Sequence, residues 1–358
     1  MSKKIFSTLL LFISMQSSVT AKIIDPENEN YLYTGRIDFN QPHIPKISWP
    51  GTSIIAKFTG SSLSIWLDDQ NGKNYYNVII DDDNTPYVIE AKKGKHKYWI
   101  SETLSSGNHK VEIYKRTEGE EGYSLFSGID IADDSDILPP PKRLVRKIEI
   151  YGDSISTGMA IEAPINGKED NPVDKNNYLA YGALAARELN AEVHSITQSG
   201  IGIMVSWFDF TMPQFYDQLN ADGNNDSQWD FKKWTPDVVL INLLQNDSWL
   251  IENPEKIGSK PTPNEIITHY IYFVRSIRSK YPNAEIICAL GSMDTTKEGS
   301  PWPGYVEKAV NIMKDEDNDS KLHTLFFDFN GYEHHPRIIQ NRVNAKKLVN
   351  KIREITHW

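Results

Sequence analysis

The chain has 358 residues, a formal net charge of −10 at pH 7, and 39% hydrophobic residues. This length allows two domains with hydrophobic cores of their own. The acidic charge argues against nucleic acid and anionic membrane surfaces as partners, whereas a neutral or cationic substrate is easier to accept.

The first residues have the pattern of a secretory signal peptide. Lys3 and Lys4 form a basic start, residues 5–15 are almost wholly apolar, and residues 19–21 (Val-Thr-Ala) form a small-residue cleavage site. The apolar run is too short to span a bilayer, although a buried N-terminal helix is the alternative interpretation. We therefore expect residues 1–21 to be a signal peptide, removed after Ala21, and the protein to be secreted or periplasmic. No later stretch predicts a membrane helix.

Residues 22–138 predict a β-sandwich domain that is similar to a jelly roll. Short runs rich in Ile, Val, Tyr, Phe and Trp are separated by Gly, Asn, Asp and Ser, and no helical periodicity interrupts them. The predicted strands cover residues 53–59, 63–67, 75–81, 86–90, 110–115 and 125–131. Two acidic runs, 81–83 and 133–136, lack the spacing of a calcium loop and are interpreted as solvated turns.

A proline-rich connector, residues 138–142, separates this domain from a second one at 142–358. There, strand-like and helical stretches alternate, which is typical of an α/β fold with a mainly parallel sheet. The predicted strands cover 145–151, 192–197, 237–244, 284–291 and 322–328, and the predicted helices cover 178–189, 264–280, 305–314 and 338–355. Cys288, the only cysteine, lies in one of these strands and is expected to be a buried core thiol.

Four polar segments follow strands or precede the last helix of this second domain. They are Asp153-Ser154, Gln198-Ser199-Gly200-Ile201-Gly202, Leu244-Gln245-Asn246-Asp247 and Glu333-His334-His335-Pro336. The carboxyl ends of parallel strands meet at one edge of a sheet, so one cleft can gather all four segments.

These residue types suit acyl transfer. The Ser154 hydroxyl would be the nucleophile, and an imidazole would remove its proton near neutral pH. The backbone N–H groups of Ser154 and Gly200 and the side-chain amide of Asn246 would hold the oxyanion. Asp153 and Asp247 are interpreted as structural residues of their turns.

In this order, Gly152-Asp153-Ser154, Gly200, Asn246-Asp247 and His335-Pro336 resemble the four blocks of the SGNH (GDSL-type) hydrolases. With the preceding sandwich and the signal peptide, the chain resembles carbohydrate esterase family 2. The resemblance implies a jelly roll followed by an SGNH α/β/α domain, and a secreted enzyme that removes acetyl groups from xylan or glucomannan. It also implies no metal and no organic cofactor.

The chain departs from the SGNH pattern at two positions. Leu244 stands where the third block usually has glycine, and Tyr332 stands where an acid usually precedes the histidine. We therefore expect a Ser154–His335 dyad, with His334 as the less favoured base. The His335 ring would be oriented by a backbone carbonyl or by a nearby carboxylate, Glu333 or Asp328.

Three tryptophans follow the strands near the expected cleft. Trp207 and Trp249 are candidates for stacking on a sugar ring, with core packing as the equal alternative, and Trp302 is a weaker candidate. The expected partner is an acetylated oligo- or polysaccharide. The alternative functions are another SGNH reaction, by a lipase, thioesterase or other esterase, and a non-catalytic glycan-binding protein.

Overall fold

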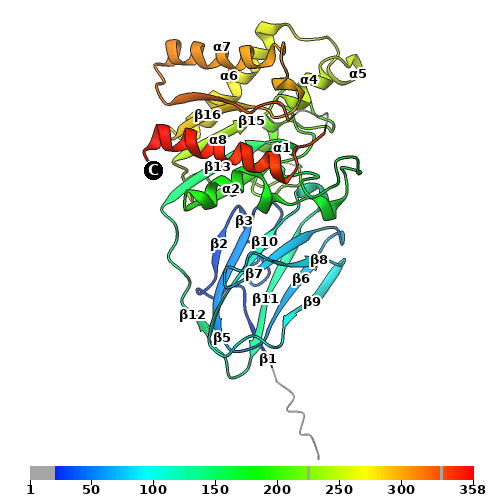
Figure 1. Cartoon of the computed structure of the whole chain (residues 1–358), viewed down its shortest axis with the longest axis vertical. Helices are drawn as coiled ribbons and strands as arrows, with labels where there is room; N and C mark the ends of the chain where they lie inside the picture. Colours follow the sequence, from blue (N-terminus) through cyan, green and yellow to red (C-terminus); the bar gives the residue numbers. More distant parts are fainter. Residues whose placement is uncertain (1–20, 224–225, 331–333) are drawn as a thin grey trace, which may run out of the picture.

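The computed structural model describes residues 21–223, 226–330 and 334–358. It contains a β-sandwich and an α/β domain, which lie one after the other along the longest axis of the molecule (Figure 1). The predicted signal peptide, apart from Ala21, lies outside the described residues. Within those residues, every helix is too short or too polar to cross a membrane.

Two antiparallel sheets form the sandwich. The first has the strand order β3-β4-β11-β6-β9, with β1 also paired to β11, and the second has the order β12-β5-β10-β7-β8, with β2 also paired to β5. Alternate side chains of both sheets, such as Ile65 and Ile113, meet in one buried core. The elements are β1 (Ala21–Ile24), β2 (Leu32–Thr34), β3 (Ile37–Asp38), β4 (Lys46–Ile47), β5 (Ser53–Thr59), β6 (Leu63–Asp69), β7 (Tyr75–Ile80), β8 (Tyr87–Glu90), β9 (Gly94–Ser101), β10 (Asn108–Lys115), η1 (Gly119–Glu121), β11 (Ser124–Ala132) and β12 (Ile137–Leu138).

The second domain is built on a five-stranded parallel sheet with the order β14-β13-β15-β16-β17. From β13 the chain continues to β14 on one side, and from β15 it continues to β16 on the other, so the order of the strands reverses between β13 and β15. The crevice beyond the carboxyl ends of these two strands is the usual ligand position in such a sheet. The fold class predicted from the sequence is confirmed. The strands are β13 (Arg146–Gly152), β14 (Ala191–Thr197), β15 (Val238–Asn242), β16 (Glu285–Leu290) and β17 (Leu322–Phe326).

Helices cover both faces of this sheet (Figure 1). Helices α2 and α8 pack with Leu240 in one core, and α6 and α7 pack with Ile241 and Cys288 in the other. Cys288 is fully buried, as predicted, and burial raises the pKa of its thiol to about 12. The helices are α1 (Ser154–Thr157), η2 (Pro172–Asp174), η3 (Asn177–Leu179), α2 (Tyr181–Glu188), α3 (Met212–Phe215), α4 (Gln245–Leu250), α5 (Pro254–Ile257), α6 (Pro263–Lys280), η4 (Asp294–Thr296), α7 (Trp302–Asp317) and α8 (Ile338–Thr356).

A buried ion pair joins the two domains. Arg36 of the sandwich reaches Glu149 in β13 with 3.0 Å between Nη2 and Oε1, and both side chains are inaccessible to solvent. Arg36 Nη1 also donates to the carbonyl oxygens of Tyr216 and Gln218, at 2.6 and 2.9 Å. Buried charges are tolerated only when they are paired and hydrogen-bonded, so this contact fixes one position of the sandwich on the sheet.

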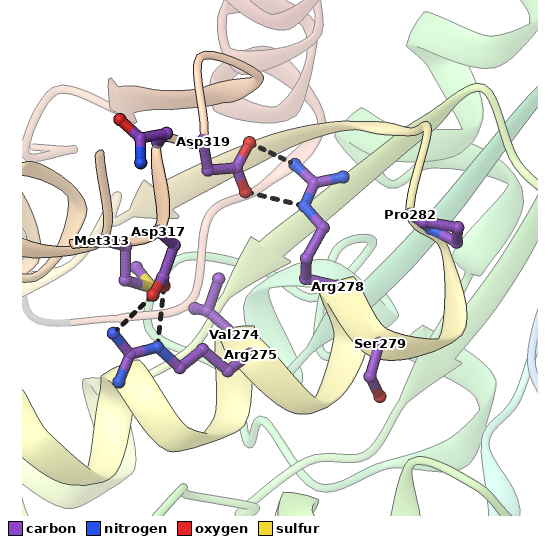
Figure 2. Close-up of a pocket in the computed structure, with 9 residues that line it drawn as sticks. Val274, Arg275, Arg278, Ser279, Pro282, Met313, Asp317 and Asp319 are labelled. Carbon is purple, nitrogen blue, oxygen red and sulfur yellow. Dashed lines mark hydrogen bonds and ion pairs between the residues drawn. The ribbon is translucent and has the colours of Figure 1, made fainter. Parts of the chain in front are cut away.

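A surface hollow of about 450 Å³ lies between the ends of α6 and α7 (Figure 2). Its charged side chains are paired with one another, Arg275 with Asp317 and Arg278 with Asp319. The hollow is next to the residues that precede β16 and β17. It therefore lies at the amino ends of these strands, whereas the four polar segments lie at the carboxyl ends. We therefore interpret these pairs as salt bridges that hold the ends of α6 and α7 together rather than as a ligand site.

Candidate active site

Ser154 is the first residue of α1, two residues after the end of β13. Asp153 caps this short helix by accepting a hydrogen bond from the Ile155 N–H at 3.0 Å, which is the turn-forming role expected for it. Burial raises the pKa of the Asp153 carboxyl to about 7. Because Ser154 opens the helix, its own N–H has no carbonyl one turn earlier to bind and can serve a ligand.

His335 faces the Ser154 hydroxyl. The distance from His335 Nε2 to Ser154 Oγ is 2.8 Å, and the His335 side chain is only 13% exposed. His334, the less favoured candidate, is 40% exposed, and its Nδ1 lies 3.7 Å from a Glu169 oxygen. The structure thus brings His335 to the serine with the geometry that a general base needs.

Glu169 lies on the other side of the His335 ring, and sequence reasoning missed it. Its Oε2 is 2.7 Å from His335 Nδ1, and its Oε1 accepts from the His335 backbone N–H at 3.2 Å. Arg337 Nη2 lies 2.8 Å from the same Oε1. Partial burial alone would raise the pKa of Glu169, but His335 and Arg337 outweigh it and lower that pKa to about 2. The carboxylate is therefore ionised at neutral pH.

Glu333 and Asp328 are the two carboxylates expected from the sequence to orient the His335 ring, and the prediction of Asp328 is wrong. Its side chain is 79% exposed and pairs with Lys347 at 2.8 Å, because β17 ends before it and turns it toward α8 at the surface. Glu333 and Tyr332 lie outside the described residues. Glu169 comes from a polar loop between α1 and η2, 166 residues before His335, and no local pattern in the sequence distinguishes it.

Gly200 and Asn246 face the same pocket as Ser154 and His335. Gly200 has a φ of +82°, and a Cβ there would lie 3.3 Å from the rings of Trp207 and Phe208, so glycine suits both the backbone and the space. Its N–H has no acceptor among the described residues and is open to a ligand.

The amide of Asn246 is held at both ends. Its Oδ1 accepts from Trp207 Nε1 at 3.1 Å, and its Nδ2 donates to the Ile201 carbonyl at 2.9 Å, which leaves a second N–H hydrogen on Nδ2. Asp247 has the structural role expected for it, because it accepts from the backbone N–H groups of Ile203 and Met204. This contact ties the loop after Gly200 to helix α4.

Two of the three candidate tryptophans line the pocket. Trp207 is 55% exposed and Trp249 is 36% exposed, and the indole N–H of Trp249 donates to Asp294 at 2.9 Å. Trp302 is wrong as a cleft residue, because it is 8% exposed and packs in the core at the start of α7. The pocket holds about 240 Å³ and is lined by Glu120, Ser154, Met159, Ser199, Gly200, Trp207, Phe208, Asn246, Trp249 and His335.

Two groups of side chains among the described residues lie close enough together to hold a metal ion. The exposed group is Asp25, Glu27 and His43, far along the chain from the pocket. The other, Glu118 with Glu120 and Glu121, surrounds the ammonium group of Lys175. The carboxylates of this second group are therefore already paired with a cation of the protein itself.

Comparison with known proteins assigns the family. Residues 33–141 match the family described as carbohydrate esterase 2, N-terminal. A solved family two carbohydrate esterase from Clostridium thermocellum, in complex with cellohexaose, is 29% identical, covers 92% of this chain and 99% of its own, and superposes with a TM-score of 0.81. The chain belongs to carbohydrate esterase family 2. The family predicted from the sequence is confirmed, and with it the class of enzyme, an ester hydrolase.

Two curated relatives are similar to this chain over most of its length. A cellulase/esterase from Acetivibrio thermocellus is 30% identical over 93% of this chain, which spans only 40% of that relative's length. An acetylxylan esterase / glucomannan deacetylase from Cellvibrio japonicus is 26% identical over 96% of this chain and 93% of its own length.

Proposed function

We propose that this chain is an acetylesterase that removes acetyl groups from a plant polysaccharide of the xylan or glucomannan type through a serine acyl-enzyme. One observation carries the proposal: the His335 ring lies between the Ser154 hydroxyl, at 2.8 Å, and the Glu169 carboxylate, at 2.7 Å. This is the arrangement in which an oriented imidazole activates a serine. The names of the curated relatives support the substrate class.

In the first half of the reaction, Ser154 Oγ attacks the acetyl carbonyl carbon while His335 Nε2 takes the hydroxyl proton. The oxyanion that forms is held by the N–H groups of Ser154 and Gly200 and by Asn246 Nδ2, and Glu169 stabilises the positive imidazolium. When the intermediate collapses, the bond from carbon to the sugar oxygen breaks. His335 gives its proton to that oxygen, and the sugar leaves with a free hydroxyl.

In the second half, water attacks the acetyl group on Ser154. His335 takes a proton from the water, and the same three donors hold the second oxyanion. The bond between the acetyl carbon and Ser154 Oγ then breaks, and His335 returns the proton to Oγ. The acetyl group leaves as acetic acid, which ionises to acetate. Each step uses groups of this chain alone: side chains and backbone N–H groups that line the pocket, and Glu169, which contacts His335.

The size and lining of the pocket favour an acetyl group over a long acyl chain. Its volume is about 240 Å³, and Met159 and Phe208 line it together with Trp207 and Trp249. A lipase would need a wider apolar surface. Trp207 and Trp249, exposed at the rim, would stack on the apolar faces of sugar rings.

The same proposal includes export of the protein. The basic, apolar and small-residue pattern of residues 1–21 supports secretion or transfer to the periplasm. A polysaccharide substrate is too large to enter a cell, so an enzyme that acts on it must reach the outside. N-terminal sequencing of the protein from the culture medium or periplasm should give Lys22 as the first residue.

The function is tested by acetate release from acetylated xylan and acetylated glucomannan, together with nitrophenyl esters of increasing chain length. We expect acetate release from at least one polysaccharide, and hydrolysis that falls steeply from nitrophenyl acetate to the octanoate. Ser154→Ala should reduce both activities by several orders of magnitude and leave the fold intact. Activity that rises with chain length would indicate a lipase or thioesterase. No turnover by the wild type would indicate the non-catalytic glycan-binding alternative.

A further inference from the structure

We propose that Glu118, a residue of the β-sandwich, is a positioning residue for Ser199 and Gly200, the loop that carries one of the oxyanion donors. The N-terminal domain would then take part in forming the esterase site. The inference rests on the proposed function, because it assigns a role in holding the Gly200 N–H. Glu118 follows β10 and directly precedes the turn η1. It lies 82 residues before Gly200 in the sequence, in the other domain.

Glu118 contacts the residue before Gly200 twice. The Ser199 hydroxyl donates to Glu118 Oε1 at 2.6 Å, and the Ser199 backbone N–H donates to Glu118 Oε2. Glu118 is completely buried, and Ser199 is 8% exposed. One carboxylate therefore holds Ser199 by its side chain and its backbone together, which restricts rotation of the peptide that ends in the Gly200 N–H.

The Glu118 carboxylate is itself held by buried charges. Lys175 Nζ lies 2.9 Å from Glu118 Oε1 and 2.5 Å from Glu121 Oε1. Lys115 Nζ donates to the Glu118 carbonyl oxygen at 3.0 Å. Burial disfavours the charged form of Lys175, but the carboxylates around it outweigh burial and raise its pKa. A carboxyl group at this depth requires a hydrogen-bonded partner, and Lys175 provides it.

The turn that follows Glu118 reaches the pocket itself. Glu120, in η1, lines the pocket together with Ser154 and His335, and its Oε2 lies 3.1 Å from Lys175 Nζ. The sandwich thus approaches the reacting groups closely enough to fix their surroundings. Donors that are held before the oxyanion forms stabilise it without reorganisation, so a looser Gly200 N–H should slow the chemical steps.

A merely structural role of Glu118 predicts a loss of stability alone, whereas a positioning role predicts a loss of kcat. Glu118→Gln keeps the volume of the side chain but replaces one acceptor of Ser199 with a donor. Glu121→Gln is the matched control, because it removes a carboxylate from the same Lys175 without contacting Ser199. Ser199→Ala removes only the hydroxyl donor, and it takes the place of Glu118→Gln in the comparison if that variant does not fold.

The experiment measures kcat and KM on nitrophenyl acetate, with thermal unfolding of each variant. We expect kcat of E118Q to fall about 10- to 100-fold, less than the loss of a whole oxyanion donor, with KM within about twofold of wild type. E121Q should keep kcat within about twofold. In the double variant E118Q/S199A, the effects on kcat should overlap rather than multiply.

Equal kcat values for E118Q and E121Q, or effects of E118Q and S199A that multiply fully, would overturn the positioning role. Failure of the proposed function has a different signature. In that case, S154A would keep the rate of the wild type, whatever the Glu118 variants do. A Ser199→Ala variant that folds and keeps the full wild-type kcat together with an inactive S154A would also count against the inference.

Discussion

At the residue scale, the site depends on a histidine ring with a defined partner on each nitrogen. Glu169, ionised because its pKa is lowered to about 2, accepts from His335 Nδ1. The Nε2 lone pair is then directed at the Ser154 hydroxyl. Arg337 holds Glu169 from its other side. The chain therefore has an acid for its histidine although Tyr332 occupies the usual position of one.

The first prediction concerns this acid. Glu169→Ala should lower kcat on nitrophenyl acetate by about 10²- to 10⁴-fold, because the imidazole loses both its orientation and the charge that stabilises imidazolium. Asp328→Asn is the matched control, since Asp328 pairs with Lys347 at the surface, and it should leave kcat unchanged. An inactive D328N together with an active E169A would reverse the assignment.

The second prediction concerns the pH dependence of stability. The pKa of Glu169 in the folded protein, about 2, is below its ordinary value of 4.5, so its stabilising effect is complete above about pH 4.5 and is lost as the pH falls toward 2. Glu169→Gln removes this effect. We expect the difference in unfolding free energy between wild type and E169Q, measured in urea, to shrink between pH 6 and pH 3. A constant difference over this range would contradict the ion pair.

At the element scale, helix α4 carries the third polar segment and starts from an unusual backbone. Leu244, its N-cap, has a φ of +82°, in the left-handed region, and its side chain is 1% exposed. A side chain in this region costs about 1–2 kcal/mol relative to glycine. The buried leucine side chain compensates by packing in the core of the α/β domain.

The third prediction separates these two effects. Leu244→Ala and Leu244→Gly both lose the packed side chain, but only glycine relieves the backbone. We expect L244G to be at least as stable as L244A in urea unfolding, although alanine is normally more stable than glycine by about 0.5–1 kcal/mol in regular structure. The same pair at Leu240, inside β15, should show the normal order. The normal order at both positions would argue against strain at Leu244.

Most elements of the α/β domain could be predicted because their signals are local. The apolar run before Ser154 and the very apolar run before Asn246 are strands β13 and β15, and the turn residues after them fall at the strand ends. Strand β9 could not be recognised in this way. Its lysines, Lys95 and Lys97, face outward over the ring of Trp66 and mask the alternation.

The prediction of the site has the same limit. Ser154, Gly200, Asn246 and His335 each follow a recognisable strand or precede a helix, so the sequence places them at one edge of the sheet. Glu169 stands in an irregular loop, and only the tertiary fold brings it to His335. The contact of Glu118 with Ser199 crosses the boundary between two domains, so no pattern within either domain predicts it.

At the scale of the whole molecule, the sandwich is bound to the α/β domain by buried charges. Arg36 pairs with Glu149, and the hydroxyl of Tyr151 donates to the other Glu149 oxygen at 2.6 Å. Glu149 and Tyr151 both belong to β13, the strand that ends at Gly152, two residues before Ser154. The interface therefore supports the strand on which the nucleophile stands.

The fourth prediction tests this interface. Arg36→Met should destabilise the protein by about 3–5 kcal/mol, because it leaves the Glu149 charge buried without a partner. The double variant R36M/E149Q should be more stable than R36M alone, since the uncompensated charge is gone. Both are measured by urea unfolding. A double variant less stable than R36M would show that the charge of Glu149 is not what the single variant exposes.

The proposed activity depends most on Ser154 being an activated nucleophile in a pocket that it shares with His335. Intact-mass analysis and peptide mapping after treatment with a fluorophosphonate test this directly. We predict one adduct per chain, on Ser154, with parallel loss of acetyl ester hydrolysis, and no adduct in Ser154→Ala or, at the same exposure, in His335→Ala. An unlabelled wild type, or labelling of another residue together with loss of activity, would contradict the role of Ser154 as the nucleophile.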